Sequence, residues 1–381
     1  MIKRSIASAL LKTKKSVLLL GPRQTGKSTL IREQIKPELQ INLAHEATYM
    51  EFARNPLELE ERLAAKTYKS VFIDEVQRLP SLLNTLQYLL DEKKWAPKFY
   101  LSGSSARKLK RGNANLLPGR VQVFHLGPLC ARELDYHLNS KQCLETGCLP
   151  GIYTEADREE QTQTLSSYAG TYLKEEIQAE ALTQNLEGFS RFLYLAAHYS
   201  GHFLDFTKLA SEAHISRQSA TRYFEILEDT LVVNRCESYG TNTKKRLIKS
   251  PKYYFFDTGV LNALLKNFNA SDDRKGLLFE HLFFNQILSS AQASGQEASI
   301  FTYRTEHGAE VDFIVEKEGK TWAIELKASV NVGPSDLRGL HHFEECHPKK
   351  AKLCVAYLGS TVKKQGEIFV YPWQELLRKM E

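Results

Sequence analysis

The first part of the chain alternates short apolar runs with amphipathic segments. Apolar runs occupy residues 16–20, 70–74 and 98–101, and a further one, VQVFHL, begins at residue 121. Apolar runs of this length, bounded by turn signals, are typical of strands that are covered on both faces. Because strands that alternate with helices form a mostly parallel sheet, the pattern predicts an α/β core over residues 1–127.

The pattern changes after residue 127. PLCARELDYHL, from residue 128, and EEQTQTLSSYAGTYLKEEIQAEAL, from residue 159, are helical in pattern and have no strand between them. We expect residues 128–188 to form a helical lid that packs on the α/β core. Residues 189–258 then predict three helices followed by two strands, LVVNRCESY and KYYFFD.

The third of these helices has two distinct faces. Ser216 is a plausible N-cap, and Ala220, Phe224 and Leu227 recur at helical spacing and should face inward. Four polar residues near the N-terminal end of the helix are left outward: Arg217, Gln218, Thr221 and Arg222. Three helices followed by a basic hairpin match the plan of a winged helix, whose third helix usually enters a DNA major groove.

The hairpin of this winged helix would carry the cations Lys244, Lys245 and Arg246, which are suited to phosphate contacts. Duplex or branched DNA is therefore the expected partner. Winged helices also serve as protein–protein modules, and three cations in a loop can simply be solvated, so a protein partner is the alternative.

Residues 259–381 predict an α/β domain that contains a hairpin, AEVDFIVEKEGKTWAIELKAS, at 309–329. If Glu318 and Gly319 form a two-residue turn, Asp312 lies directly opposite Glu325, with their Cβ atoms roughly 5 Å apart. Lys327 then shares a face with Glu325. The apolar residues of the other face should point to the core: Val311, Phe313, Val315, Trp322, Ile324 and Leu326.

Two carboxylates beside a lysine suit a divalent cation and a scissile phosphate. Glu280 interrupts the apolar face of a helix at 276–288 and is a candidate third ligand. The sequence thus predicts a nuclease-like site of Glu280, Asp312, Glu325 and Lys327 that would hold a second Mg²⁺ or Mn²⁺. The alternatives are an inactive binding module and a surface ion pair of little energetic value.

The segment SVLLLGPRQTGKST has the residues that a phosphate-binding loop needs. Its glycines let backbone N–H groups surround phosphate oxygens, Lys27 reaches the β- and γ-phosphates, and Ser28 offers a hydroxyl to Mg²⁺. ATP and Mg²⁺ are the expected cofactors. The predicted nucleotide-binding residues are Gly21, Pro22, Arg23, Gln24, Thr25, Gly26, Lys27, Ser28 and Thr29.

Further catalytic residues follow on the later strands. Asp74 and Glu75 end an apolar strand, where Asp74 would hold Mg²⁺ and Glu75 would polarise the attacking water. After the next strand, Ser104 is the expected γ-phosphate sensor, with Ser102 and Ser105 as alternatives to it. Arg120 would either stabilise charge in the transition state or form a structural salt bridge.

Composition limits the cellular setting. The 381 residues are enough for several domains, and the formal net charge of +6 suits an anionic partner. The six cysteines include no CxxC pair and read as free thiols, and a zinc site at Cys143 and Cys148 lacks further ligands. No segment has the pattern of a signal peptide or a membrane span, so we expect a cytoplasmic protein with no membrane contact.

Taken together, these motifs resemble a bacterial and archaeal family of AAA+-type ATPases related to the STAND and archaeal-ATPase branch. The resemblance implies a P-loop ATPase, a winged-helix region and a C-terminal PD-(D/E)xK-like domain of unknown function. It also implies homo-oligomers, ATP hydrolysis at Lys27, Asp74 and Glu75, and a DNA transaction. The segments that carry it are GPRQTGKST, VFIDEVQRLP, LSGSSA, LLPGR, TGCLPGIY, KYYFFDTGVLNAL, GLLFEHL and AEVDFIV with AIELKAS.

Two functions follow from this reading. In the first, an ATP-driven enzyme binds and remodels or processes DNA. In the second, a nucleotide-controlled oligomeric switch or scaffold binds protein partners and its nuclease-like domain is inactive. The predicted division is an ATPase core at 1–127, a helical lid at 128–188, a winged helix at 189–258 and a nuclease-like domain at 259–381.

Overall fold

The structure is a computed structural model that describes residues 2–381 except 93–95, 105–116, 174–184, 241–249 and 348–350. Its chain divides into two compact units. The first unit comprises Met1–Gly127 with Asp229–Val232 and Gln292–Gly295, and the second comprises Pro128–Glu228, Val233–Ala291 and Gln296–Glu381. No helix in the described part is long and apolar enough to cross a membrane.

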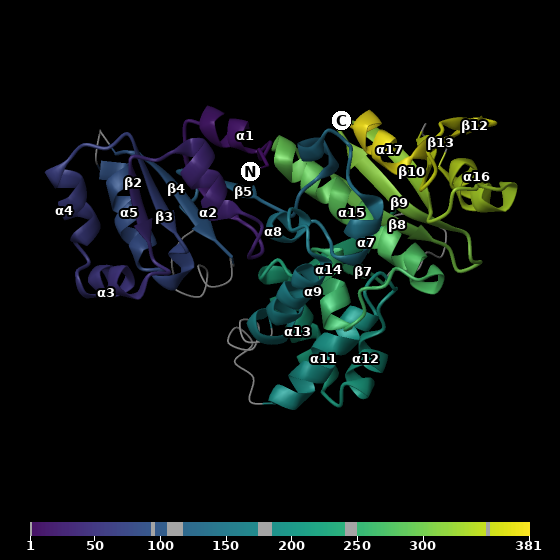
Figure 1. Cartoon of the computed structure of the whole chain (residues 1–381), viewed down its shortest axis with the longest axis horizontal. Coiled ribbons are helices and arrows are strands. Elements are labelled where there is room, and N and C mark those ends of the chain that lie inside the picture. Colours follow the sequence, from purple (N-terminus) through teal and green to yellow (C-terminus); the bar gives the residue numbers. More distant parts are fainter. Residues whose placement is uncertain (1, 93–95, 105–116, 174–184, 241–249, 348–350) are drawn as a thin grey trace. The chain divides into compact units, whose positions relative to one another are not determined.

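The first unit contains a five-stranded sheet in the order β2-β3-β4-β1-β5, in which every neighbouring pair is parallel (Figure 1). The predicted α/β core with a parallel sheet is therefore confirmed. Its strands are β1 (Ser16–Leu20), β2 (Leu39–Asn42), β3 (Ser70–Asp74), β4 (Lys98–Gly103) and β5 (Val121–His125), and its helices are α1 (Ala7–Lys12), α2 (Lys27–Leu30), α3 (Glu46–Arg54), α4 (Glu58–Ala65) and α5 (Leu82–Glu92).

Both faces of this sheet are covered because alternate residues of its strands point to opposite sides. Leu18 and Ile73 belong to a buried cluster with apolar residues of α3, α4 and α5. Val17 and Phe72 belong to a second cluster with α1 and the helical segment that begins at Lys27. The covered faces explain why these strands appear in the sequence as unbroken apolar runs.

The second unit begins with short helices. They are α7 (Ser140–Glu145), α8 (Pro150–Tyr153) and α9 (Arg158–Ser167), with α14 (Thr258–Leu264) packed against α7 and α9. The helix predicted from residue 128 is wrong. It shrinks to one 3₁₀ turn at Ala131–Leu134, because Asp135 and Tyr136 both adopt positive φ and end the turn.

Asp257 joins two of the segments on which the family resemblance rests. Its buried carboxylate caps α14, accepting the N–H groups of Gly259 at 2.8 Å and Val260 at 3.2 Å, and it also accepts the N–H of Cys148 at 2.7 Å. A Cβ atom on Gly147 would lie 2.0 Å from an Asp257 oxygen, so only glycine fits there. The segment TGCLPGIY is thus held by a buried carboxylate 109 residues away.

Next come α11 (Leu186–His198), α12 (Phe206–Glu212), α13 (Arg217–Asp229) and two antiparallel strands, β6 (Val233–Ser238) and β7 (Lys252–Phe255). The Ser216 hydroxyl caps α13 by accepting the N–H of Ser219 at 3.0 Å. As predicted, the side chains of Ala220, Phe224 and Leu227 are buried. A single β-bridge joins Phe203, which lies between α11 and α12, to Lys252 of β7.

The two strands join a larger sheet. Its order is β12-β13-β11-β10-β9-β8-β6-β7, with β6 parallel to β8. The other members are β8 (Ser299–Arg304), β9 (Glu310–Lys317), β10 (Lys320–Lys327), β11 (Lys352–Tyr357), β12 (Lys363–Gln365) and β13 (Ile368–Pro372). Lys317 pairs with Lys320 and Phe313 with Ile324, so the predicted two-residue turn and register of the hairpin are confirmed.

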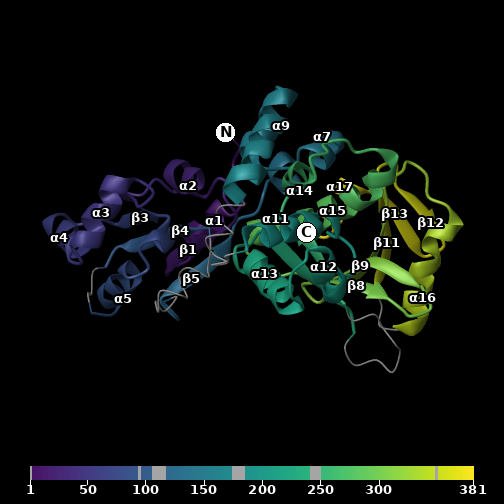
Figure 2. The ribbon, with the colours of Figure 1, turned by 90° about the horizontal axis from the view of Figure 1, so that it is seen from below.

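Helices cover both faces of this second sheet. Figure 2 shows the long helix α15 (Asp272–Ser294) and α16 (Arg338–Cys346) beside the strands of this sheet. Phe313 of β9 contacts Phe283 and Phe284 of α15, and the next residue, Ile314, belongs to a buried cluster with α16. The terminal helix α17 (Trp373–Lys379) meets α15 through Trp373 and Phe279. The expectation that only one side of the hairpin faces the core is therefore wrong, because α16 buries the other side.

Candidate functional site

The phosphate-binding loop connects β1 to α2 in the first unit. A Cβ atom on Gly21 would lie 2.2 Å from the Leu126 carbonyl oxygen, so the loop can approach β5 only with glycine at this position. Gly26 has φ +88°, which is the left-handed conformation that glycine adopts without strain. Lys27 donates to the carbonyl oxygens of Gly21 and Pro22, at 2.8 Å each. The loop therefore places the Lys27 ammonium group within its own curve.

Two further contacts fix the shape of the loop. The Thr25 hydroxyl donates to the Pro22 carbonyl at 2.8 Å. Arg4, which is buried, donates to the carbonyl oxygens of Thr25 and Gly127. Arg4 is not among the predicted site residues, since its partners lie 21 and 123 residues away and no local pattern links them.

Asp74 is the buried centre of this site. Its Oδ1 accepts the hydroxyl groups of Ser28 at 2.8 Å and Ser102 at 2.5 Å, and its Oδ2 accepts Arg32 at 2.9 Å. Hydroxyl and carboxylate oxygens are the ligands that Mg²⁺ prefers, and Mg²⁺ uses few protein ligands when it binds with a nucleotide. Ser28 and Asp74 therefore fit the ion expected beside ATP.

Glu75 follows Asp74 with φ +57°, and its N–H donates to the Ser102 hydroxyl at 3.2 Å. Its carboxylate accepts the side-chain amide of Gln77, and the same amide donates to the Ser104 hydroxyl at 3.1 Å. Gln77 thus connects the expected catalytic glutamate to the expected sensor serine. Gln77 is not among the predicted site residues, although its place two residues after Glu75 is a usable signal.

Arg120 and the two alternatives to Ser104 are the other predicted catalytic residues of the first unit. Arg120 forms an ion pair with Asp91 of α5, which is the salt-bridge alternative for this residue. Of the two alternatives to Ser104, Ser102 contacts Asp74, and Ser105 lies outside the described residues. The catalytic roles of these residues stay predictions.

Four of the seven predicted DNA-contact residues lie on α13. Arg217, Gln218, Thr221 and Arg222 are all exposed on one part of this helix, as the sequence pattern predicts. Lys244, Lys245 and Arg246 lie outside the residues that the structure describes.

In the second unit, the paired residues of the hairpin end at Phe313 and Ile324, one position before Asp312 and Glu325. The register of β9 against β8 shifts over the same residues, so the predicted direct opposition of Asp312 and Glu325 stays a prediction. Asp312 accepts the N–H of Leu326 at 2.7 Å, and Glu325 pairs with Lys327 at 3.1 Å. Lys327 also contacts Asp336 at 3.4 Å. Burial raises the pKa of Glu325 to about 7, against the opposing effect of Lys327, and burial followed by the charges of Glu325 and Glu280 raises that of Asp312.

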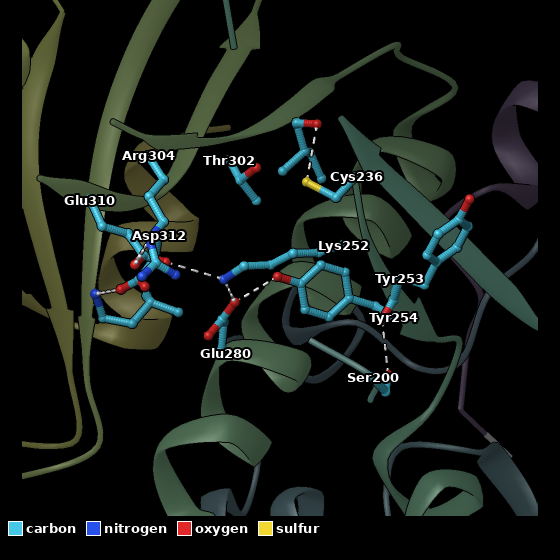
Figure 3. A network of polar contacts seen from close by, with 12 residues as sticks. Ser200, Cys236, Lys252, Tyr253, Tyr254, Glu280, Thr302, Arg304, Glu310 and Asp312 are labelled. Atoms are coloured by element: carbon cyan, nitrogen blue, oxygen red, sulfur yellow. Dashed lines mark hydrogen bonds and ion pairs between the residues drawn. The ribbon is translucent and has the colours of Figure 1, made fainter. Parts of the chain in front are cut away.

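Glu280, the predicted third carboxylate ligand, contacts side chains of β7 (Figure 3). Its Oε1 accepts the ammonium group of Lys252 at 2.9 Å and the Tyr254 hydroxyl at 2.6 Å. Lys252 also reaches Glu310 at 3.4 Å, and Glu310 contacts Arg304 at 3.6 Å. Lys252 is not among the predicted site residues, although a lysine at the start of the apolar run KYYFFD is an available signal.

These contacts do not fit a second Mg²⁺ or Mn²⁺ held by three carboxylates. Within the described part of the chain, no group of three or more His, Cys, Asp or Glu side chains is arranged to hold a metal ion. Lys252 and Tyr254 engage Glu280, so Asp312 and Glu325 remain as a pair. One oxygen of this pair, Glu325 Oε2, is buried with no hydrogen-bond partner.

Comparisons with known proteins support the assignment of the first unit as an ATPase domain. Residues 13–135 match the AAA domain family, residues 138–271 match a domain of unknown function (DUF8612), and residues 275–376 match another (DUF4143). The chain is 30% identical over 324 residues to the uncharacterized proteins Mb2031c of Mycobacterium bovis and Rv2008c of Mycobacterium tuberculosis, covering 82% of this chain and 70% of each relative. The chain belongs to their family. The expected AAA-type ATPase domain is thereby confirmed, and the PD-(D/E)xK-like assignment stays a prediction.

Two solved structures are weakly similar to the chain. The replication initiator DnaA bound to AMPPCP and single-stranded DNA has a TM-score of 0.27 at 11% identity. The Bacillus subtilis DNA clamp loader delta protein has a TM-score of 0.25 at 14% identity. Each match covers 58% of this chain and 86% of the other. Scores this low do not bear on the function of the family.

Proposed function

We propose that the protein is a Mg²⁺-dependent ATPase that binds and remodels DNA. The observation that carries the ATPase part is the buried Asp74 carboxylate, which contacts Ser28 of the phosphate-binding loop and Ser102 of β4. A nucleotide phosphate bound at the loop would thus lie beside the carboxylate, the hydroxyl groups and Lys27. The match of residues 13–135 to the AAA domain family supports the same reading.

Each residue of the site has a defined task in this proposal. The loop N–H groups and Lys27 bind the β- and γ-phosphates and orient them. Glu75 accepts a proton from the attacking water, and the contact of Gln77 with both Glu75 and Ser104 sets the direction of that carboxylate. Ser28 and Asp74 would hold Mg²⁺, which would supply positive charge to offset the charge of the phosphates.

DNA is the proposed partner because of the order of elements in the second unit. Helices α11, α12 and α13 followed by antiparallel β6 and β7 support a winged helix, with α13 as the groove-binding helix. Arg217 and Arg222 are exposed on α13, and both are cations suited to phosphates or base edges. We infer homo-oligomers as well, which are common among AAA-type ATPases.

DNA cleavage would require the hairpin carboxylates of the second unit. Asp312 on β9 and Glu325 on the neighbouring β10, with Lys327 beside Glu325, support such a site. The ion pair of Glu280 with Lys252 opposes it, because it engages the proposed third ligand. The function that we propose is therefore remodelling of DNA, with cleavage as a separate outcome of the test.

The test measures ATP hydrolysis and DNA binding of the full chain with duplex and four-way-junction DNA, in Mg²⁺. We expect DNA to raise the rate of hydrolysis and Lys27→Ala to abolish it. Arg217→Ala with Arg222→Ala should weaken DNA binding and reduce the slope of log K against log salt by about 2, since each phosphate contact releases counterions. A matched control removes two exposed cations of β12, Lys363 and Lys364, and should leave the slope unchanged.

Three outcomes would contradict parts of the proposal. Hydrolysis by Lys27→Ala would refute the assignment of the phosphate-binding loop. A rate indifferent to DNA, together with an ATP-dependent change in oligomer size, would favour the nucleotide-controlled switch. Cleavage of DNA that disappears in Asp312→Asn would make the hairpin a nuclease site.

A further inference from the structure

Lys252 is a buried lysine among carboxylates. Its side chain is 5% exposed, and its ammonium nitrogen lies 2.9 Å from Glu280 and 3.4 Å from Glu310. The residue is held in place from both sides of its backbone, since β7 pairs it with Cys236 of β6 and a β-bridge joins it to Phe203. The ammonium group thus has a fixed position at the start of a buried strand.

A buried ammonium group is costly unless it is paired, because it loses its hydration. Here burial lowers the pKa of Lys252, but the charges of Glu280, Asp312 and Glu310 outweigh it and raise the pKa above its usual value. The ion pairs of Lys252 with Glu280 and Glu310 offset the cost of burying the ammonium group.

The helix glutamate is satisfied by the chain itself. Lys252 and Tyr254, two positions apart on β7, both donate to the same oxygen of Glu280 (Figure 3). Alternate residues of a strand share a face, so β7 presents a cation and a hydroxyl to this carboxylate together. A divalent ion that used Glu280 would first have to displace both donors.

We propose that the ammonium group of Lys252 is the resident cation of the cluster formed by Glu280, Glu310 and Asp312. The second unit holds these carboxylates together with no divalent ion. Removing the lysine leaves three neighbouring carboxylates with one cation fewer, which is the donor set of a hard divalent ion such as Mn²⁺ or Mg²⁺. The inference is independent of the proposed ATPase, because it concerns residues of the second unit alone.

The experiment measures Mn²⁺ binding to the full chain without nucleotide, from the electron paramagnetic resonance signal of free Mn²⁺. All variants carry Asp74→Asn, which removes the metal-binding carboxylate of the first unit. We expect no Mn²⁺ bound at the cluster in this background. Lys252→Met should add about one Mn²⁺ per chain, with an affinity at least about tenfold above any binding by the background, since a like charge is removed from the site.

Matched variants locate the ion. Lys252→Arg keeps the positive charge and should gain no Mn²⁺, whereas Glu280→Gln added to Lys252→Met should abolish the gain. The proposal is overturned if the background already binds one Mn²⁺ that Asp312→Asn removes, or if folded Lys252→Met gains none. If Lys252→Met does not fold, thermal unfolding of the Asp74→Asn chain tests the proposal. We expect the same melting temperature in Mn²⁺ and in EDTA, and a rise in Mn²⁺ that Asp312→Asn abolishes would refute the proposal.

Discussion

Replacing Asp257 tests whether its carboxylate holds the segment around Cys148 in the second unit. Asp257→Ala removes the N-cap of α14, which costs about 1 kcal/mol in typical helices. It also leaves the buried N–H of Cys148 without its acceptor, which costs a further 1–3 kcal/mol or so. The free energy of unfolding should therefore fall by about 2–4 kcal/mol.

Asp205 offers a matched control in the same unit. Its carboxylate caps α12 by accepting the N–H groups of Thr207 at 2.8 Å and Lys208 at 3.2 Å, but it is exposed and these contacts lie within its own helix. Asp205→Ala should lose only the cap, about 1 kcal/mol. The difference between the two variants then isolates the contact between Asp257 and Cys148.

The assay is urea unfolding of both variants and the unmodified chain at pH 5, followed by circular dichroism. Burial raises the pKa of Asp257 to about 6, against the effect of its three backbone donors, so at pH 5 the folded carboxyl group is mostly neutral and carries little cost of buried charge. An equal fall in the free energy of unfolding of Asp257→Ala and Asp205→Ala would refute the reasoning. The buried contact with Cys148 would then add nothing to an ordinary helix cap.

Three further predictions follow from contacts in the two units. In Asp257→Asn the side chain at this position no longer titrates. Because the folded pKa of Asp257 is raised, its contribution to the free energy of unfolding falls as pH rises, and the stability advantage of the unmodified chain over this variant should shrink by about 1 kcal/mol between pH 5 and pH 7. Urea unfolding at both pH values measures this difference, and a constant difference would contradict the raised pKa. Gln77→Ala removes the amide that holds the Glu75 carboxylate and should lower kcat for ATP about tenfold with KM unchanged. Steady-state hydrolysis measures both constants, and a change confined to KM would instead assign Gln77 to nucleotide binding. Arg32→Ala removes a half-exposed cation from Asp74 and should lower the Mg²⁺ concentration for half-maximal hydrolysis about threefold, and a higher requirement would show that Arg32 helps to bind the phosphates.

Local patterns were enough to predict the parts of the fold that depend on neighbouring residues. The apolar runs gave the strands of the first sheet because both of its faces are covered, and the two-residue turn at Glu318 and Gly319 gave the register of the hairpin. The faces of α13 followed from helical spacing in the same way. In each case the deciding contacts lie within a few residues or are set by strand and helix geometry.

Contacts between distant segments could not be predicted in this way. Lys252 contacts Glu280 and Glu310, which lie 28 and 58 residues further along the chain, and the strand pattern around it gives no sign of either partner. Asp257 and Cys148 are farther apart still. The helix predicted from residue 128 failed for a different reason, because the positive φ of Asp135 and Tyr136 overrides an amphipathic pattern.

The parallel pairing of β6 with β8 makes the predicted boundary at residue 258 a poor place to divide the chain. A fragment that begins at residue 259 would lose β6 and β7 and leave β8 as an unpaired edge, open to pairing with another molecule. It would also lose Lys252, leaving Glu280 and Glu310 without their nearest cation. Such a fragment should aggregate, and on our proposal its carboxylates Glu280, Glu310 and Asp312 would bind a metal ion where Lys252 lies in the full chain. Activities measured on the fragment would therefore describe a different molecule.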